Sequence, residues 1–241
     1  MGAKRVMRQS DIRKLVYIVS SVNEVIHYFE VLTSFLQSRR YNIDYIILSE
    51  GETYLEKYLK GVGVNVIRTQ YTKKAHLPRA IWTIYKHLVT QPHFAVHTHL
   101  FEAGLAGMIA GTLARSRHRI CTRWHSDMHQ QSHPRAVKYD RLCNALATHL
   151  ITPSAGTKDY LVTHEGVPSA KVHTNEIGFD VEQFENVDPQ RIENLKKRYN
   201  PEGRKPCIGV IARQVEWKGV HHIVEAFRRL RKEVPNAYLI L

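Results

Sequence analysis

No segment of the sequence approaches the roughly 20 consecutive apolar residues that a membrane-spanning helix requires. Residues 1–14 also lack the apolar stretch of a signal peptide, although they carry several Arg and Lys residues. With 43% hydrophobic residues among 241, the chain has enough apolar material for a globular core. These features predict a folded cytoplasmic protein.

Cysteine is scarce, with three residues far apart in the sequence and set among apolar neighbours. Such spacing fits buried reduced thiols better than a disulfide framework or a metal site. We therefore predict that Cys121, Cys143 and Cys207 are reduced and buried in the core.

Acidic residues are few relative to basic ones, 22 Asp and Glu against 35 Lys and Arg, which gives a net charge of +13. Such a surface attracts anions, including nucleotides, phospholipid headgroups and nucleic acid. No recognised nucleic-acid-binding motif accompanies the charge, so we predict no nucleic-acid partner. A basic face fits peripheral association with the anionic inner face of a membrane.

Histidine is abundant, with 15 residues, and several lie close together in the sequence. These groups lack the Cys or carboxylate spacing of known metal motifs. The sequence therefore predicts neither a metal nor another cofactor. The groups are His97 and His99, then His125, His129 and His133, then His221 and His222.

Apolar runs of strand length alternate with segments of helical periodicity along the chain. The predicted strands cover residues 15–19, 43–48, 64–68, 94–97, 119–122, 149–152, 172–174, 207–212 and 237–241. The predicted helices cover residues 24–39, 53–60, 80–89, 102–115, 134–147, 156–164, 189–199 and 220–233. This alternation indicates βαβ units, hence an α/β fold with a Rossmann-like parallel sheet flanked by helices.

Two helices carry further signals. The segment 102–115 is rich in Gly and Ala, which favours close packing against a sheet at a cost in helix propensity. Ser154 precedes the helix at 156–164 and is a suitable N-cap.

The strongest turn cluster in the sequence is Asn-Pro-Glu-Gly-Arg-Lys-Pro at residues 200–206. It predicts three parts: a first domain at residues 1–187, a linker at 188–206, and a single βαβ unit at 207–241. At about 35 residues, this last unit is shorter than most domains that fold alone. We expect it to be either an appendage of the first domain or the start of a longer one.

The strand predicted at 207–212 leads through a basic loop into the helix at 220–233. Backbone N–H groups, the positive end of the helix and the cations Arg213 and Lys218 are thereby aimed at one region. This arrangement suits a diphosphate.

Taken together, these segments resemble the retaining glycosyltransferases of family 4, which have the GT-B architecture of two facing Rossmann-like domains. The resemblance covers most of the chain from about Phe94 onward. The segments that carry it are His97-Thr98-His99 with the small-residue helix, residues 122–129, Ile151-Thr152-Pro153-Ser154, Ile177-Gly178-Phe179-Asp180 with Phe184, and residues 213–219 with Glu225-Ala226-Phe227.

The resemblance implies transfer of a sugar from a nucleotide-diphosphate sugar to a glycan or lipid-linked acceptor, with retention of configuration. In the family, an Arg and a Lys in the loop after the first strand of the second domain bind the donor diphosphate. The matching residues are Arg213 and Lys218, followed by Gly219 at the helix start. His125 matches the active-site histidine near the transferred sugar, on the other side of the cleft.

Several further residues are predicted to line the acceptor side or the cleft, namely Asn23, His99, Glu102, Arg123, Ser126, Asp127, His129 and Gly178. For His99 and Glu102, a capping or core-edge role explains the sequence equally well. Asp127 is a candidate to orient His125 or to bind an acceptor hydroxyl. Gly178 is expected to form a tight turn where the chain crosses between domains.

The sequence departs from the family pattern in two places. Residues 20–24 read Ser-Ser-Val-Asn-Glu, where the family has a Gly-rich turn. The family's pair of Glu residues, eight apart in the later second domain, has no counterpart before Leu241. The alternative function is therefore a non-catalytic acceptor-binding fragment or partner subunit without a complete donor site. The sequence does not predict an oligomeric state.

Overall fold

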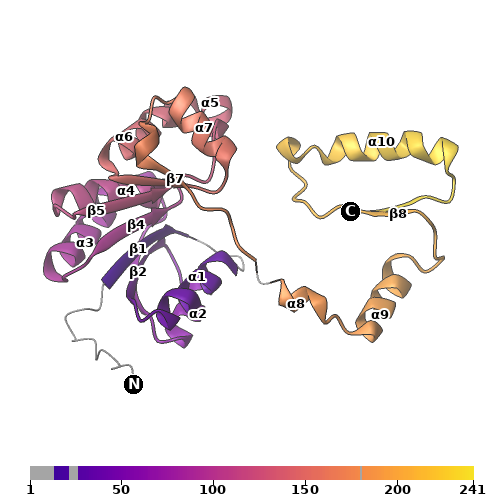
Figure 1. The fold of residues 1–241 in the computed structure, drawn as a ribbon, viewed down its shortest axis with the longest axis horizontal. Coiled ribbons are helices and arrows are strands. Elements are labelled where there is room, and N and C mark those ends of the chain that lie inside the picture. Colours follow the sequence, from indigo (N-terminus) through magenta and orange to yellow (C-terminus); the bar gives the residue numbers. More distant parts are fainter. Residues whose placement is uncertain (1–13, 22–26, 180) are drawn as a thin grey trace, which may run out of the picture. The chain divides into compact units, whose positions relative to one another are not determined.

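The computed structural model describes residues 14–21, 27–179 and 181–241. It divides into two compact units, Met1–Phe179 and Asp180–Leu241, both drawn in Figure 1.

The first unit is built on a seven-stranded sheet in which every paired strand is parallel, in the order β3-β2-β1-β4-β5-β6-β7. The predicted Rossmann-like parallel sheet is confirmed. Because the order reverses beside β1, the topological switch point lies between β1 and β4. The strands are β1 (Lys14–Ser20), β2 (Asn42–Ser49), β3 (Asn65–Gln70), β4 (Ala95–His99), β5 (His118–Thr122), β6 (His149–Thr152) and β7 (Val172–Thr174).

Helices cover both faces of this sheet because its central strands are apolar on both sides. Along β1, Val16 and Ile18 pack with residues of α3 and α4, whereas Tyr17 and Val19 pack with residues of α1 and α2. Figure 1 shows these two helix pairs on opposite sides of the strands. The helices are α1 (His27–Ser38), α2 (Tyr54–Gly61), α3 (Leu77–Thr90), α4 (Phe101–Leu113), α5 (Met128–Ser132), α6 (Val137–Leu146) and α7 (Ala155–Thr163).

Most predicted elements lie where the patterns place them. Ser154 caps α7 as predicted, since its Oγ accepts a hydrogen bond of 3.2 Å from the Thr157 backbone N–H. Two differences are local. The helix predicted at 134–147 begins with a 3₁₀ turn, Pro134–Ala136, and the short helix α5 was not predicted. None of the described helices is long and apolar enough to span a bilayer.

Close packing of α4 on the sheet is confirmed at Gly107. A Cβ atom at this position would lie 2.4 Å from Thr98 Cγ2 and 2.8 Å from Ile18 Cδ1. At Gly104, by contrast, the nearest atom would be Cys121 Sγ at 3.8 Å, which is an ordinary contact. Only Gly107 of these two is therefore required for the approach of α4 to β1 and β4.

The two glycines predict opposite effects on stability. Replacing a helical glycine by alanine favours the helix by up to about 1 kcal/mol. At Gly107 the clash outweighs this gain, because overpacking a core costs about 1–3 kcal/mol. We expect Gly107→Ala to lower the free energy of unfolding and Gly104→Ala to leave it unchanged or raise it, as measured by urea denaturation. Equal effects of the two substitutions would contradict the packing described.

The second unit contains one small parallel sheet, in which β8 pairs with β9. Its elements are α8 (Glu182–Glu185), α9 (Pro189–Tyr199), β8 (Cys207–Gly209), the 3₁₀ turn η5 (Glu216–Lys218), α10 (Val220–Glu233) and β9 (Tyr238–Ile240). The strand predicted at 207–212 is shorter than expected, and the Ile211 side chain beyond it is fully exposed. Ala237 is the only buried residue among those whose burial is described in this unit.

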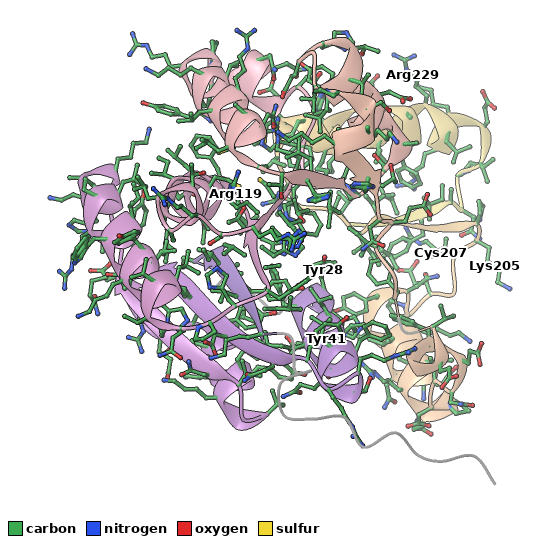
Figure 2. The ribbon with its side chains drawn as sticks, turned by 60° about the vertical axis from the view of Figure 1, so that its left-hand side comes forward. Tyr28, Tyr41, Arg119, Lys205, Cys207 and Arg229 are labelled. Carbon is green, nitrogen blue, oxygen red and sulfur yellow. The ribbon has the colours of Figure 1, made fainter. Side chains whose placement is uncertain are left out.

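The prediction for cysteine holds for two of the three residues. Cys121 and Cys143 are buried and free, and burial raises the pKa of both thiols. The prediction is wrong for Cys207, which is exposed on β8 and labelled in Figure 2. A sheet of two strands offers too little surface to cover it.

Candidate functional site

The carboxyl ends of β1, β4 and β5 lie side by side. In register, Val19 pairs with His99, and His99 pairs with Thr122. The segments that follow these strands therefore meet at one edge of the sheet, beside the switch point where open α/β sheets bind ligands. Asn23, predicted to lie here, is outside the described residues.

His99 lies inside the sheet edge rather than on its surface. Its ring is fully buried and packs against Tyr17 and Phe29, with ring centroids 5.7 and 5.0 Å away. Burial, with a smaller contribution from the neighbouring His97, holds the pKa of His99 well below its usual value. The imidazole is therefore neutral and belongs to the aromatic core beneath the edge.

Glu102 and Leu100 form the start of α4 at this edge. Glu102 accepts a 3.4 Å hydrogen bond from Ser20 Oγ, which in turn accepts one of 3.0 Å from the Ala103 backbone N–H. Leu100 has a φ of 70° and a ψ of 167°, a conformation that is almost restricted to glycine and costs other residues about 1–3 kcal/mol. Strain of this kind is often found at ligand-binding sites.

Arg123 is held in a buried ionic network. Its guanidinium donates to both carboxylate oxygens of Glu165 at 3.0 Å and to Asn144 Oδ1 at 2.9 Å, and it lies 3.7 Å from Asp140 Oδ2. Burial opposes the charge on Glu165, but the hydrogen bonds from Arg123 and Asn144 outweigh it and lower the Glu165 pKa. The network connects the segment after β5 with α6 and with Glu165, which follows α7.

His125 stands next to a second buried pair. His129 Nδ1 and Asp140 Oδ2 are 2.6 Å apart, and the ring of His125 lies 4.3 Å from that of His129 between centroids. Burial and the nearby Arg123 lower the pKa of His125, although Asp140 and a backbone contact with Ser126 oppose the shift. Its Nδ1 has no hydrogen-bond partner of ordinary geometry among the described residues.

Asp127 does not contact His125 among the interactions described for this loop. Its carboxylate accepts hydrogen bonds from Ser126 Oγ at 3.1 Å and from Gln131 Nε2 at 2.5 Å. The carboxylate next to the histidines is instead that of Asp140, which we did not predict. A signal for it was available, since Asp140 lies on the buried face of α6 with Cys143 and Asn144.

His125, His129 and Asp140 could also be considered as a cation site, because one ligand atom from each lies within 4.8 Å of the others. The Asp140 oxygen is already bonded to His129 and faces the Arg123 guanidinium at 3.7 Å. A cation bound there would have to displace the hydrogen bond between His129 and Asp140. It would also be repelled by the positive charge of Arg123. This donor set fits an internal hydrogen bond between His129 and Asp140 better than a metal.

In the second unit, Arg213 and Lys218 meet at one side chain. The Arg213 guanidinium carbon lies 5.4 Å and Lys218 Nζ 4.4 Å from the centre of the Trp217 ring. Trp217 is 67% exposed, and Gly219, with a φ of 66°, follows it as the N-cap of α10. Two cations and the N-terminus of a 14-residue helix thus lie after the carboxyl end of β8. We had not singled out Trp217, which brings the two cations together.

Gly178 lies in an irregular segment, where residues 175–179 form neither a helix, a strand nor a turn. Its φ is not positive, and an added Cβ would meet nothing within 4 Å. The expectation of a tight turn there is wrong.

The parallel sheet with its switch point, together with a basic strand-loop-helix unit, defines a Rossmann-like architecture of the GT-B type. A comparison of the sequence with protein families identifies the family of the chain. The family described as "Glycosyl transferase 4-like domain" matches residues 25–178, and the chain belongs to this family. The matched region includes His125 and its buried neighbours and ends before Arg213 and Lys218.

Several known proteins are similar to the chain in sequence or in fold. Alpha-maltose-1-phosphate synthase of Mycolicibacterium smegmatis is 24% identical over 154 residues, which cover 61% of this chain and 39% of that protein. HepE of Anabaena, solved with UDP and glucose, has a TM-score of 0.70 at 14% identity over 93% of this chain and 59% of its own. A glycosyltransferase from Rickettsia africae has a TM-score of 0.69 at 16% identity, covering 92% and 58%.

The two structural likenesses show the fold alone at such low identity. The chain spans less than two thirds of the length of each of these three proteins.

Proposed function

We propose that this chain acts in the transfer of a sugar from a nucleotide-diphosphate sugar to a glycan or lipid-linked acceptor, with retention of configuration. The observation that carries the proposal is the meeting of Arg213 and Lys218 on Trp217 at the start of α10. Membership of the glycosyl transferase 4-like family supports it. HepE was solved with UDP and glucose, which makes a uridine diphosphate sugar the first donor to test.

In the proposed reaction, the bond between the sugar anomeric carbon and the diphosphate oxygen breaks, and a bond from that carbon to the acceptor oxygen forms on the same face. The acceptor proton passes to the leaving diphosphate, so no separate general base is needed. Arg213, Lys218 and the first N–H groups of α10 stabilise the charge that develops on the diphosphate. No metal is required in this scheme.

His125 is proposed to donate a hydrogen bond to a sugar hydroxyl or a phosphate oxygen. Its lowered pKa makes the neutral imidazole the main form at neutral pH, and this form carries one donor N–H. Asp140 accepts from the neighbouring His129 and thereby fixes the ring beside it. Asp140 and His129 are thus positioning residues.

Replacing His125 by alanine is expected to lower the transfer rate about 100-fold, the typical effect of removing one preorganised donor. Transfer from radiolabelled UDP-sugars to lipid and glycan acceptors measures the rate, and NMR of the product gives its anomeric configuration. His133→Ala, at an exposed histidine eight residues later, is the control and should leave the rate unchanged.

The same assay distinguishes sugar transfer from the alternative function, acceptor binding without catalysis. Acceptor binding without transfer or hydrolysis of any nucleotide sugar would favour a non-catalytic acceptor-binding subunit. A product of inverted configuration would contradict retention while leaving sugar transfer intact.

A further inference from the structure

One face of the first unit carries exposed apolar side chains around a hollow. The hollow, with a volume of about 340 Å³, is lined by Pro78, Ile81, Trp82, Tyr85 and Leu113 from α3 and the end of α4. Trp82 is 63% and Leu113 61% exposed, and the rings of Trp82 and Tyr85 stack with centroids 5.6 Å apart. We name these five residues the α3–α4 face.

Two of these side chains, Ile81 and Tyr85, are partly buried and pack against the core, whereas Trp82 is exposed. Ala80, Ile84 and Leu88 already bury the inner side of the helix against the sheet. Trp82 therefore lies outside the core, next to the exposed Leu113, and contiguous exposed apolar side chains commonly mark a contact surface.

The surroundings of the α3–α4 face are positively charged. Arg79 and Lys86 lie three residues before and four residues after Trp82, so all three side chains share one side of α3. Lys73 and Lys74 precede the helix, and Arg115 follows α4. All five cations are exposed, and none forms an ion pair with a described residue.

Acidic residues are nearly absent from this part of the chain. Residues 69–115 contain these five Lys and Arg residues and a single acidic residue, Glu102. That carboxylate lies in the first turn of α4 and accepts from Ser20, whereas Leu113 ends the same helix. The apolar α3–α4 face is thus accompanied by exposed cations with almost no acidic residues among them.

We infer that the α3–α4 face docks on an anionic phospholipid surface. Trp and Tyr prefer the boundary between hydrocarbon and headgroups, and Lys and Arg are attracted to negatively charged headgroups. A continuous layer of phosphates matches exposed, unpaired cations on and next to α3 and α4 better than a protein surface of mixed charge does. The protein would lie on the membrane rather than cross it. This inference does not depend on sugar transfer.

The test is co-sedimentation of the whole chain with vesicles of phosphatidylcholine alone or mixed with phosphatidylglycerol. We expect binding only to the mixed vesicles, weakening as salt rises. The variant Arg79→Glu with Lys86→Glu should bind at least roughly 30-fold more weakly, the effect of removing two charges near an anionic surface. The control Lys197→Glu with Arg228→Glu changes the net charge equally, at exposed positions of the second unit, and should bind like the unaltered chain.

A fluorescence measurement tests the apolar part of the face. The chain has three tryptophans, so Trp124→Phe with Trp217→Phe leaves Trp82 as the reporter. Its emission should shift to shorter wavelength with mixed vesicles and be quenched by brominated lipids.

Binding that ignores lipid charge, or that the α3 and control variants weaken equally, would overturn the inference. So would a lipid-free blue shift of Trp82 that grows with protein concentration together with a dimer in sedimentation, because a second copy would then occupy the face.

Discussion

Replacing Arg123 by methionine is expected to lower the free energy of unfolding by about 3–5 kcal/mol, the largest stability effect of any single change discussed for this chain. The guanidinium is 4% exposed and faces two carboxylates, those of Glu165 and Asp140. Methionine fills a similar volume but supplies neither charge nor donors. Both carboxylates would then be buried without the cation that compensates them.

The loss of unfolding free energy in Arg123→Met should depend on pH, and the direction of this dependence follows from the pKa of Glu165. In the unaltered protein its pKa is lowered, so its contribution to stability is present above the unfolded value near 4.3 and is lost as the pH falls. Without Arg123, burial dominates and the pKa of Glu165 rises instead. The stability difference between the two proteins should therefore shrink as the pH is lowered from 7 toward 4.

Urea denaturation at several pH values measures this difference. Arg117→Met, at an exposed arginine just before β5, is the matched control and should change stability by less than about 0.5 kcal/mol. A loss below about 1 kcal/mol for Arg123→Met, or one independent of pH, would show that the buried carboxylates find other compensation.

The order of strands and helices could be predicted because each carries its own local pattern. The strand at β1 reads as a continuous apolar run since α1 and α2 cover one face and α3 and α4 the other. The small residues of the α4 segment likewise predicted close packing, which Gly107 makes against Thr98 and Ile18. The patterns that predict these features each lie within a single helix or strand, although the contacts themselves are long-range.

The buried network could not be predicted in the same way. Arg123 and Glu165 are 42 residues apart, so their pairing exists only after β5, α6 and α7 have packed. The helix α5 has the sequence Met-His-Gln-Gln-Ser, which carries no apolar periodicity, and it places His129 beside Asp140. Sequence motifs indicated His125 but not Asp140, the carboxylate that is hydrogen-bonded to His129.

The length of β8 was predicted wrongly for a related reason. An apolar run at 207–212 predicts a long strand, but β9 pairs with only three of its residues. The length of a strand is set by its partners, which a local pattern does not contain. The remaining residues form the loop that leads to Arg213 and Trp217.

That loop gives the prediction with the largest effect on binding. Arg213→Ala and Lys218→Ala are each expected to reduce the affinity for UDP about 10-fold to 100-fold, because a hydrogen bond to a charged group contributes about 1.5–3 kcal/mol. Trp217→Ala should cause a smaller loss of roughly threefold to fivefold, since an exposed cation–π contact contributes about 0.5–1 kcal/mol. Trp217→Phe should restore most of it.

Isothermal titration with UDP and with uridine distinguishes a phosphate site from a base site. Uridine lacks the diphosphate, so its weaker binding should be the same in all four variants and in the unaltered chain. Arg229→Ala is the control, because this exposed residue of α10, labelled in Figure 2, pairs with Glu225 four residues earlier. Since Arg213 and Lys218 would hold the same diphosphate, the double variant should lose less than the two single losses combined. Equal losses for UDP and uridine would instead mean that the substitutions disturb the fold of the second unit, and the anion site would have to be sought elsewhere.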